Sequence, residues 1–262
     1  MVSRKRAKTV DLSNEAILKR IETIKADHPA WGYRRVWAYL KYREDLEINK
    51  KRVYRLLKEN KLLAPQISNN RAKRTPLRSK PRADKPNKIL GTDMTKIMVD
   101  SWGWLYLHVV LDWGSKKIVG WHLSPQSKTD DWLKALSNGV NEQFPQGVRK
   151  AHGLKLVSDN GSQPTSVKFM AACRVMEMTQ IFTSYNNPKG NADTERVIRT
   201  IKEDLIWPRD WFSFEQLNLA LHRWVKDYNE DFPHSAINYK TPVQFEQEFL
   251  TQNTNNFSQT FC

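Results

Sequence analysis

The chain has 262 residues, enough for one large domain and a small second one. Its two cysteines, Cys173 and Cys262, exclude a disulfide framework and a four-cysteine zinc site, and they suit a reducing compartment. The sequence shows no signal peptide and no apolar run of membrane-spanning length, so we expect a soluble intracellular protein.

The positive charge is concentrated in the first third of the chain. Residues 1–88 hold 25 Lys and Arg against 9 Asp and Glu, whereas residues 89–262 hold 18 against 19. A solvated basic surface would account for a few surplus lysines but not for this segregation. The pattern indicates that the first third binds a polyanion and that the remainder has another task.

Three short helices are predicted in residues 13–63, after a basic, flexible tail over residues 1–12. Isoleucines spaced at i, i+4 and i+7 define the first helix, over residues 13–27. The second helix covers residues 33–43, and Asn49 caps the third. Three helices of which the third is basic favour a helix-turn-helix DNA-binding domain over an ordinary three-helix bundle with surface lysines.

The third helix and the segment that follows it supply the expected DNA contacts. Residues 64–88 contain four prolines and few apolar side chains, so we expect an extended linker rather than a packed element. A linker needs so many cations only where it lies along phosphates. The residues expected to contact DNA are Lys50, Lys51, Arg52, Arg55, Arg71, Lys73, Arg74 and Arg78.

From residue 89 onward the pattern is that of a mixed sheet-and-helix domain. Segments rich in β-branched and aromatic residues, at 89–99, 103–113 and 116–124, predict three strands of an antiparallel meander. The elements expected next are a helix (129–140), a buried strand (153–159), a helix (164–178), a strand (179–184) and a helix that begins after Asn191. The order βββαβαβα argues for a single five-stranded α/β domain.

This domain is expected to cover residues 89–250. Two further helices, over residues 212–228 and 241–249, complete it. Residues 251–262 are polar and are predicted to be disordered. Most of the ten tryptophans are expected in the core, with Trp207 and Trp211 as surface exceptions.

Three acids stand on separate predicted elements of this domain. Asp93 lies within the first strand, Asp159 ends a short apolar strand, and Glu195 lies in the helix after Asn191. Asp193 falls in the first turn of that helix, where the helix dipole accounts for it without a catalytic role. Clustered carboxylates raise one another's pKa values unless a cation neutralises them. Oxygen ligands of this kind suit Mg²⁺ or Mn²⁺, and two such ions can promote attack on a phosphodiester.

Other polar residues lie near these acids in the sequence. Asn160 and Gln163 follow Asp159, and Arg199 follows Glu195 by one helical turn, so the three are candidate substrate contacts. Asp112 ends the second strand before a Gly-Ser turn, and we assign it to turn chemistry rather than to catalysis.

These motifs together resemble a known family. Asp159 and Glu195 have 35 residues between them, and with Asp93 they resemble the DD35E pattern of retroviral-integrase-like transposases, which have an RNase H-like core. The similarity is greater to the insertion-sequence family called IS-three, in the product of its second reading frame. It covers about residues 15–250 and rests on HPAWGYRRVWAYLK, NKKRVYRLLKENKLL, LDWGSKKIVGW, SDNGSQ, KGNADTERVIRTIKED and YNEDFPHSAINYKTP, in that order.

The resemblance implies an enzyme, a DDE-type transposase that cleaves DNA at element ends and transfers strands. It assigns Asp93, Asp159 and Glu195 as catalytic acids that bind two Mg²⁺ or Mn²⁺ ions, and Lys202 as a DNA contact near the reacting end. The implied partners are double-stranded DNA, as element ends and as target, further copies of the chain on DNA, and the upstream reading frame product. The implied location is the bacterial cytoplasm, where the protein would associate with the nucleoid and not with a membrane.

Two other functions remain open at this point. One is a DNA-binding regulator or inactive transposase relic whose core no longer cuts DNA. The other is a plain RNase H-like nuclease, which would cut without joining and would leave the basic first third harder to explain.

Overall fold

A computed structural model describes residues 13–64, 82–147, 153–183 and 190–259, with side chains up to residue 252 in the last helix. The chain divides into two compact units. The first comprises residues 1–72 and 233–239, and the second comprises residues 73–232 and 240–262.

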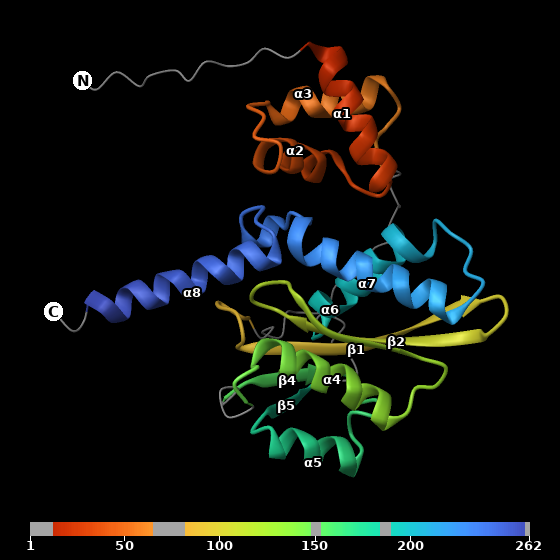
Figure 1. Ribbon diagram of the computed structural model, residues 1–262, viewed down its shortest axis with the longest axis vertical. Helices are drawn as coiled ribbons and strands as arrows, with labels where there is room; N and C mark the ends of the chain where they lie inside the picture. Colours follow the sequence, from red (N-terminus) through yellow and green to blue (C-terminus); the bar gives the residue numbers. More distant parts are fainter. Residues whose placement is uncertain (1–12, 65–81, 148–152, 184–189, 260–262) are drawn as a thin grey trace, which may run out of the picture. The chain divides into compact units, whose positions relative to one another are not determined.

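The first unit contains the three predicted helices, which Figure 1 shows in red to orange: α1 (Asn14–Asp27), α2 (Tyr33–Tyr42) and α3 (Lys50–Glu59). The Ser13 hydroxyl caps α1 by accepting the N–H of Ala16, and the Asn49 side chain caps α3 by accepting the N–H of Lys51. The apolar stripes that the sequence predicts pack into one core, formed by Ile17, Ile21, Ile24, Val36, Leu40, Val53, Leu56 and Leu57.

The second unit is built on the predicted five-stranded mixed sheet. Its strands are β1 (Ile89–Val99), β2 (Gly103–Asp112), β3 (Ile118–Ser124), β4 (Lys155–Ser158) and β5 (Thr179–Phe182). They lie in the order β3-β2-β1-β4-β5. The first three strands form the antiparallel meander, whereas β4 pairs in parallel with both β1 and β5. Parallel pairing requires crossover connections, which the helices between these strands provide.

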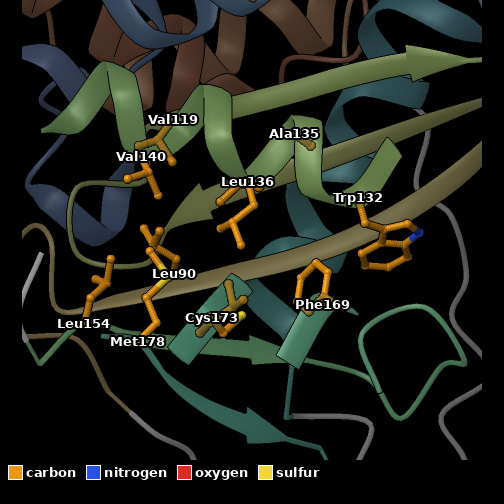
Figure 2. Packing of buried hydrophobic residues seen from close by; sticks show 12 residues of the cluster. Leu90, Val119, Trp132, Ala135, Leu136, Val140, Leu154, Phe169, Cys173 and Met178 are labelled. Carbon is orange, nitrogen blue, oxygen red and sulfur yellow. The ribbon is translucent and has the colours of Figure 1, made fainter. Parts of the chain in front are cut away.

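Helices cover both faces of this sheet. They are α4 (Thr129–Gln143), α5 (Val167–Val175), α6 (Ala192–Ile201) and α7 (Phe214–Asp231). The last helix, α8 (Pro242–Gln259), packs against α7. On one face, α4 and α5 pack on β1, β3 and β4 through one apolar cluster, centred on Leu90, Leu136 and Phe169 (Figure 2). On the opposite face, α6 lies against β1 and β2, and α7 lies against β3 (Figure 1).

Most predicted elements differ from the structure by a few residues at their ends, and three differences have a clear physical reason. The α5 helix begins at Val167 rather than 164, because Ser166 is its N-cap and its hydroxyl accepts the N–H of Phe169. The last helix continues to Gln259 through most of the predicted disordered tail, a stretch that lacks glycine and proline to end it. Trp211 is buried and donates its indole N–H to the carbonyl of Ile206, so its predicted surface position is wrong.

Candidate active site

Two of the predicted acids lie at matching positions along neighbouring strands. Gly91 of β1 lies beside Val157 of β4, at the last pair of their parallel register. Asp93 and Asp159 are each two residues farther along the chain from this pair. Asp93 is half-buried within β1, whereas Asp159 is exposed in the turn after β4. The register therefore places both carboxylates just beyond the end of the pairing between β1 and β4, at the carboxyl end of β4.

The turn after β4 holds the Asp159 carboxylate. Its Oδ1 accepts the N–H of Gly161 at 3.1 Å. A side chain at Gly161 would be crowded, because a Cβ atom there would lie 3.0 Å from the same oxygen. The second carboxylate oxygen is not used in this turn hydrogen bond, so turn chemistry and a ligand role are compatible for Asp159.

The third acid is on α6. Asn191 occupies the predicted N-cap position, and the N–H of Glu195 donates to its carbonyl at 3.1 Å in the first helical turn. Val197, Ile198 and Ile201 belong to the buried face of the helix. Glu195 lies on the exposed side, next to this face. The amphipathic pattern of α6 thus keeps the Glu195 side chain accessible to a ligand.

The electrostatics of Asp93 connect all three acids. Burial is the main cause that raises the pKa of Asp93 to about 6. The N–H of Met94 donates to Asp93 Oδ1 at 2.7 Å and opposes this rise in pKa. The charges of Asp159 and Glu195 raise the pKa further, whereas that of Lys202 lowers it. Asp159, Glu195 and Lys202 therefore all lie within electrostatic range of Asp93.

This donor set fits a divalent metal ion. Three carboxylates offer only oxygen atoms, and their mutual repulsion would be relieved by a cation. Within the described ranges, no group of three or more His, Cys, Asp or Glu side chains already converges as a metal site. The fit therefore rests on the chemistry of Asp93, Asp159 and Glu195 and on their electrostatic coupling.

Lys202 and Arg199 extend the site along α6. The helix changes at Lys202 into a π-helical turn, η2 (Lys202–Ile206), a rare form that often occurs at functional positions. Lys202 is half-buried at its start. Arg199 forms an ion pair with Glu203, with its Nε 2.6 Å from Oε1. The charge of Arg199 is thus paired with Glu203, whereas the charge of Lys202 lowers the pKa of Asp93.

Three further polar residues near the acids support the backbone. The Asn160 side chain donates to the carbonyl of Thr183 at the end of β5. Gln163 Nε2 donates to the carbonyl of Ser127, just before α4. Asp112 is fully buried, and its carboxylate accepts the N–H groups of Asn87, Gly114 and Ser115. This turn role of Asp112 is the predicted one, and substrate contact by Asn160 and Gln163 stays a prediction.

Two hydrogen bonds near the start of α6 were not predicted from the sequence. The indole N–H of Trp113 donates to the Thr194 hydroxyl at 3.1 Å, and the Asn191 side chain donates to the Thr92 carbonyl at 3.1 Å. Gly91 permits this close approach, because a Cβ atom there would lie 2.1 Å from the Thr194 hydroxyl oxygen. Gly91 lies inside a predicted strand, and a glycine at such a position can indicate that another segment approaches the backbone closely.

The predicted DNA-binding residues of α3 differ in their surroundings. Lys50 Nζ lies 4.1 Å from the Trp37 ring centroid, in a cation–π contact. Arg52 donates to the Asn14 side chain at 2.9 Å, and Arg55 lies 3.9 Å from Glu59. Lys51 is exposed. Arg71, Lys73, Arg74 and Arg78 lie outside the described residues.

A pocket of about 460 Å³ lies elsewhere in the second unit. It is formed by β3, α4, α7 and the start of α8, with Trp121, His122 and His222 in its lining. None of the three predicted acids is among the residues that line it. Among the described residues, no helix is both long enough and apolar enough to cross a membrane.

The comparison with family models matches this two-part organisation. Residues 13–69 match a model described as an HTH-like domain. Residues 83–188 and 176–242 match two models, both described as an integrase core domain, which together span more than half of the chain. The chain belongs to the integrase-core family. This assignment agrees with the resemblance of the sequence motifs to integrase-like transposases. The match of residues 13–69 to an HTH-like domain confirms the helix-turn-helix prediction for the first helices.

Similar proteins are transposases of insertion sequences. The chain is 33% identical over 170 residues to the transposase for insertion sequence element IS904 of Lactococcus lactis, an alignment that covers 63% of this chain and 64% of that protein. It is 26% identical over 256 residues to the transposase InsD for insertion element IS2A/D/F/H/I/K of Escherichia coli, which covers 94% of this chain and 82% of that protein. The integrase-core chain thus spans just under two thirds of the first relative and about four fifths of the second.

A solved structure shares the fold. It is the simian T-cell lymphotropic virus intasome in complex with the PP2A regulatory subunit B56 gamma, with a TM-score of 0.53 and 16% sequence identity. The match covers 88% of this chain and 74% of that chain. Together with the sheet order, this likeness confirms the predicted RNase H-like integrase core.

Proposed function

We propose that the protein is a DDE-type DNA transposase, a polynucleotidyl transferase that cleaves phosphodiesters at the ends of an insertion element and transfers the strands. The observation that supports the proposal is that Asp93 and Asp159 both lie just beyond the end of the pairing between β1 and β4. The charges of Asp159 and Glu195 both act on Asp93 there. Membership of the integrase-core family and similarity to insertion-sequence transposases support it.

Asp93, Asp159 and Glu195 would hold the divalent metal, Mg²⁺ or Mn²⁺, with two ions expected. When bound, these ions supply activation of the attacking hydroxyl and stabilisation of the leaving oxygen. Asp93 holds its carboxylate half-buried in β1, and Asp159 keeps one oxygen bonded to the turn. Lys202, at the start of the π-helical turn, supplies a positive charge for the phosphate beside the reacting bond.

The first unit and the basic linker would bind the DNA. Residues 1–88 carry a net charge of +16, which gives a sequence-independent attraction to phosphates. Lys51 and Arg55, which are exposed on α3, would contact the DNA, together with the neighbouring Lys50 and Arg52. We further propose assembly of several copies on DNA, cooperation with the upstream reading frame product, and action at the nucleoid of a bacterial cell.

An oligonucleotide assay tests this function against its alternatives. The parent chain, with Mg²⁺ or Mn²⁺, is incubated with DNA that carries the terminal repeats flanking its gene and with a target plasmid. The proposal expects cleaved ends and joined products, and Asp159→Asn should give neither. Cleavage without joining would indicate a plain nuclease. Binding without cleavage would indicate a regulator or an inactive relic.

A further inference from the structure

Two hydrogen bonds hold α6 on the sheet next to the candidate catalytic acids. Asn191 donates to the carbonyl of Thr92, the residue before Asp93. Trp113 donates to the hydroxyl of Thr194, the residue before Glu195. Each bond thus acts one residue away from a carboxylate.

Both bonds are shielded from water. Trp113 is 2% exposed, Thr194 is fully buried and Asn191 is 5% exposed. Gly91, two residues before Asp93, leaves the space in which the Trp113 indole meets the Thr194 hydroxyl, since a Cβ atom there would lie 2.2 Å from the indole nitrogen. A buried bond of this kind keeps its geometry because its polar atoms have no water to replace their partner.

The acids next to these bonds tend to separate. Asp93 and Glu195 carry like charges that act on one another. Glu195 is exposed in the first turn of α6. Metal ligands that must meet around one ion depend on neighbouring hydrogen bonds for their orientation.

We propose that Trp113 and Thr194 are positioning residues that fix the Glu195 carboxylate relative to Asp93 for divalent metal binding, with Asn191 holding the first turn of α6 in place. Neither Trp113 nor Thr194 would contact the reacting atoms. The inference rests on the proposed function, because it assumes that the acids bind the metal. It adds residues from the turn after β2, an element that carries none of the three acids.

Metal binding to the protein without DNA tests this role. Mn²⁺ is titrated into the full chain, and its dissociation constant is measured by calorimetry and by the rise in Tm. The variants are Thr194→Val, which keeps the side-chain shape but removes the acceptor, Thr194→Ser, which keeps the hydroxyl, and Trp113→Phe. We expect Thr194→Val and Trp113→Phe to weaken Mn²⁺ binding by about tenfold or more, and Thr194→Ser to bind like the parent.

Trp132→Phe is the matched control. Trp132 is 3% exposed, and its indole N–H also donates to a hydroxyl, that of Ser127, on the face of the sheet covered by α4. This variant should lower the Tm in the absence of metal much as Trp113→Phe does, yet leave the Mn²⁺ dissociation constant at the parental value.

The outcomes separate the inference from the function. A parent chain that binds no Mn²⁺ would contradict the proposed function and, with it, this inference. A parent that binds Mn²⁺ while Thr194→Val binds it equally well would overturn the inference alone. Equal weakening in Trp132→Phe and Trp113→Phe would also overturn it, because the effect would then be one of general stability. Should Trp113→Phe fail to fold, the comparison of Thr194→Val with Thr194→Ser decides.

Discussion

The carboxylate of Asp193 lies 3.6 Å from the Nζ of Lys116, in a part-buried ion pair between the start of α6 and the turn after β2. Glu195 is two residues farther along the helix, on its exposed side. The two neighbouring acids therefore have different tasks. Asp193 helps to hold α6 on the sheet, whereas we propose that Glu195 binds the metal.

Asp193→Asn should keep most of the cleavage activity. Its helix-dipole interaction contributes roughly 0.3–1 kcal/mol, and a partly exposed ion pair adds a similar amount. We expect a small decrease in Tm and a cleavage rate close to that of the parent, because a protein stable by about 5–15 kcal/mol stays almost fully folded after a loss of about 1–2 kcal/mol. Loss of activity in this variant at a temperature where it stays folded would transfer the catalytic role to Asp193.

Asp93→Asn should change how the stability of the metal-free protein depends on pH. The folded pKa of Asp93, about 6, lies above the ordinary value of 3.8, so the folded state binds the proton more tightly than the unfolded state. This contribution to stability is present below pH 4 and is lost as the pH rises through 6. Asn resembles the protonated acid, and at pH 7.5 the variant should exceed the parent by about 2–3 kcal/mol.

Urea unfolding at pH 3.5 and 7.5, with a chelator present, measures this difference. Parent and variant should have similar free energies of unfolding at the lower pH and should diverge at the higher one. If the free energies of unfolding of the parent and of Asp93→Asn differed by the same amount at both pH values, the charged form of Asp93 would not be destabilised by burial and by its acidic neighbours.

Lys202→Ala should weaken strand transfer more than DNA affinity. Lys202 acts electrostatically on Asp93, so we propose that its charge lies near the reacting bond, whereas the net charge of +16 on residues 1–88 would supply most of the binding strength. Loss of one hydrogen bond to a charged phosphate should reduce the single-turnover rate by about 10- to 100-fold. Lys168→Ala, on the exposed side of α5, is the control and should react like the parent. An unchanged rate for Lys202→Ala at saturating DNA would remove this role.

DNA binding should depend steeply on salt. Every duplex phosphate that a Lys or Arg neutralises adds about 0.9 to the steepness of log K plotted against log salt concentration. Lys51→Ala combined with Arg55→Ala should therefore make the plot shallower by about 2, as measured by fluorescence anisotropy between low and moderate salt. A slope equal to that of the parent would show that the exposed side of α3 does not bind phosphates.

Local sequence patterns were sufficient to predict most of the fold and the candidate acids. Strands β1 to β3 are rich in β-branched and aromatic residues, and the spacing of isoleucines in α1 and α6 marks the buried faces of these helices. Asp93 and Asp159 could be placed because each stands at a defined point of a strand. Their matching positions beyond Gly91 and Val157, however, depend on the parallel register of β1 and β4.

Interactions between distant segments could not be predicted in this way. Trp113 and Thr194 are 81 residues apart, and only the packing of α6 on β1 and β2 brings them together. Trp211 reads as a surface residue beside a proline, yet the carbonyl of Ile206 accepts its indole N–H inside the core. The partners of Asn160 and Gln163 likewise come from loops that the sheet and α5 bring side by side.

The central claim is that Glu195 binds a catalytic metal together with Asp93 and Asp159. Its most direct test is the Tm of the parent, Glu195→Gln and Asp193→Asn with and without Mn²⁺, measured beside DNA cleavage. A metal that binds only the folded state at 100 times its dissociation constant stabilises it by about 2.7 kcal/mol. We predict a clear Mn²⁺-dependent rise in Tm for the parent and Asp193→Asn, both active. Glu195→Gln should show a much smaller rise and no cleavage, with a metal-free Tm at or slightly above the parental value. An active Glu195→Gln with a parental metal response, beside an inactive Asp193→Asn, would contradict the account.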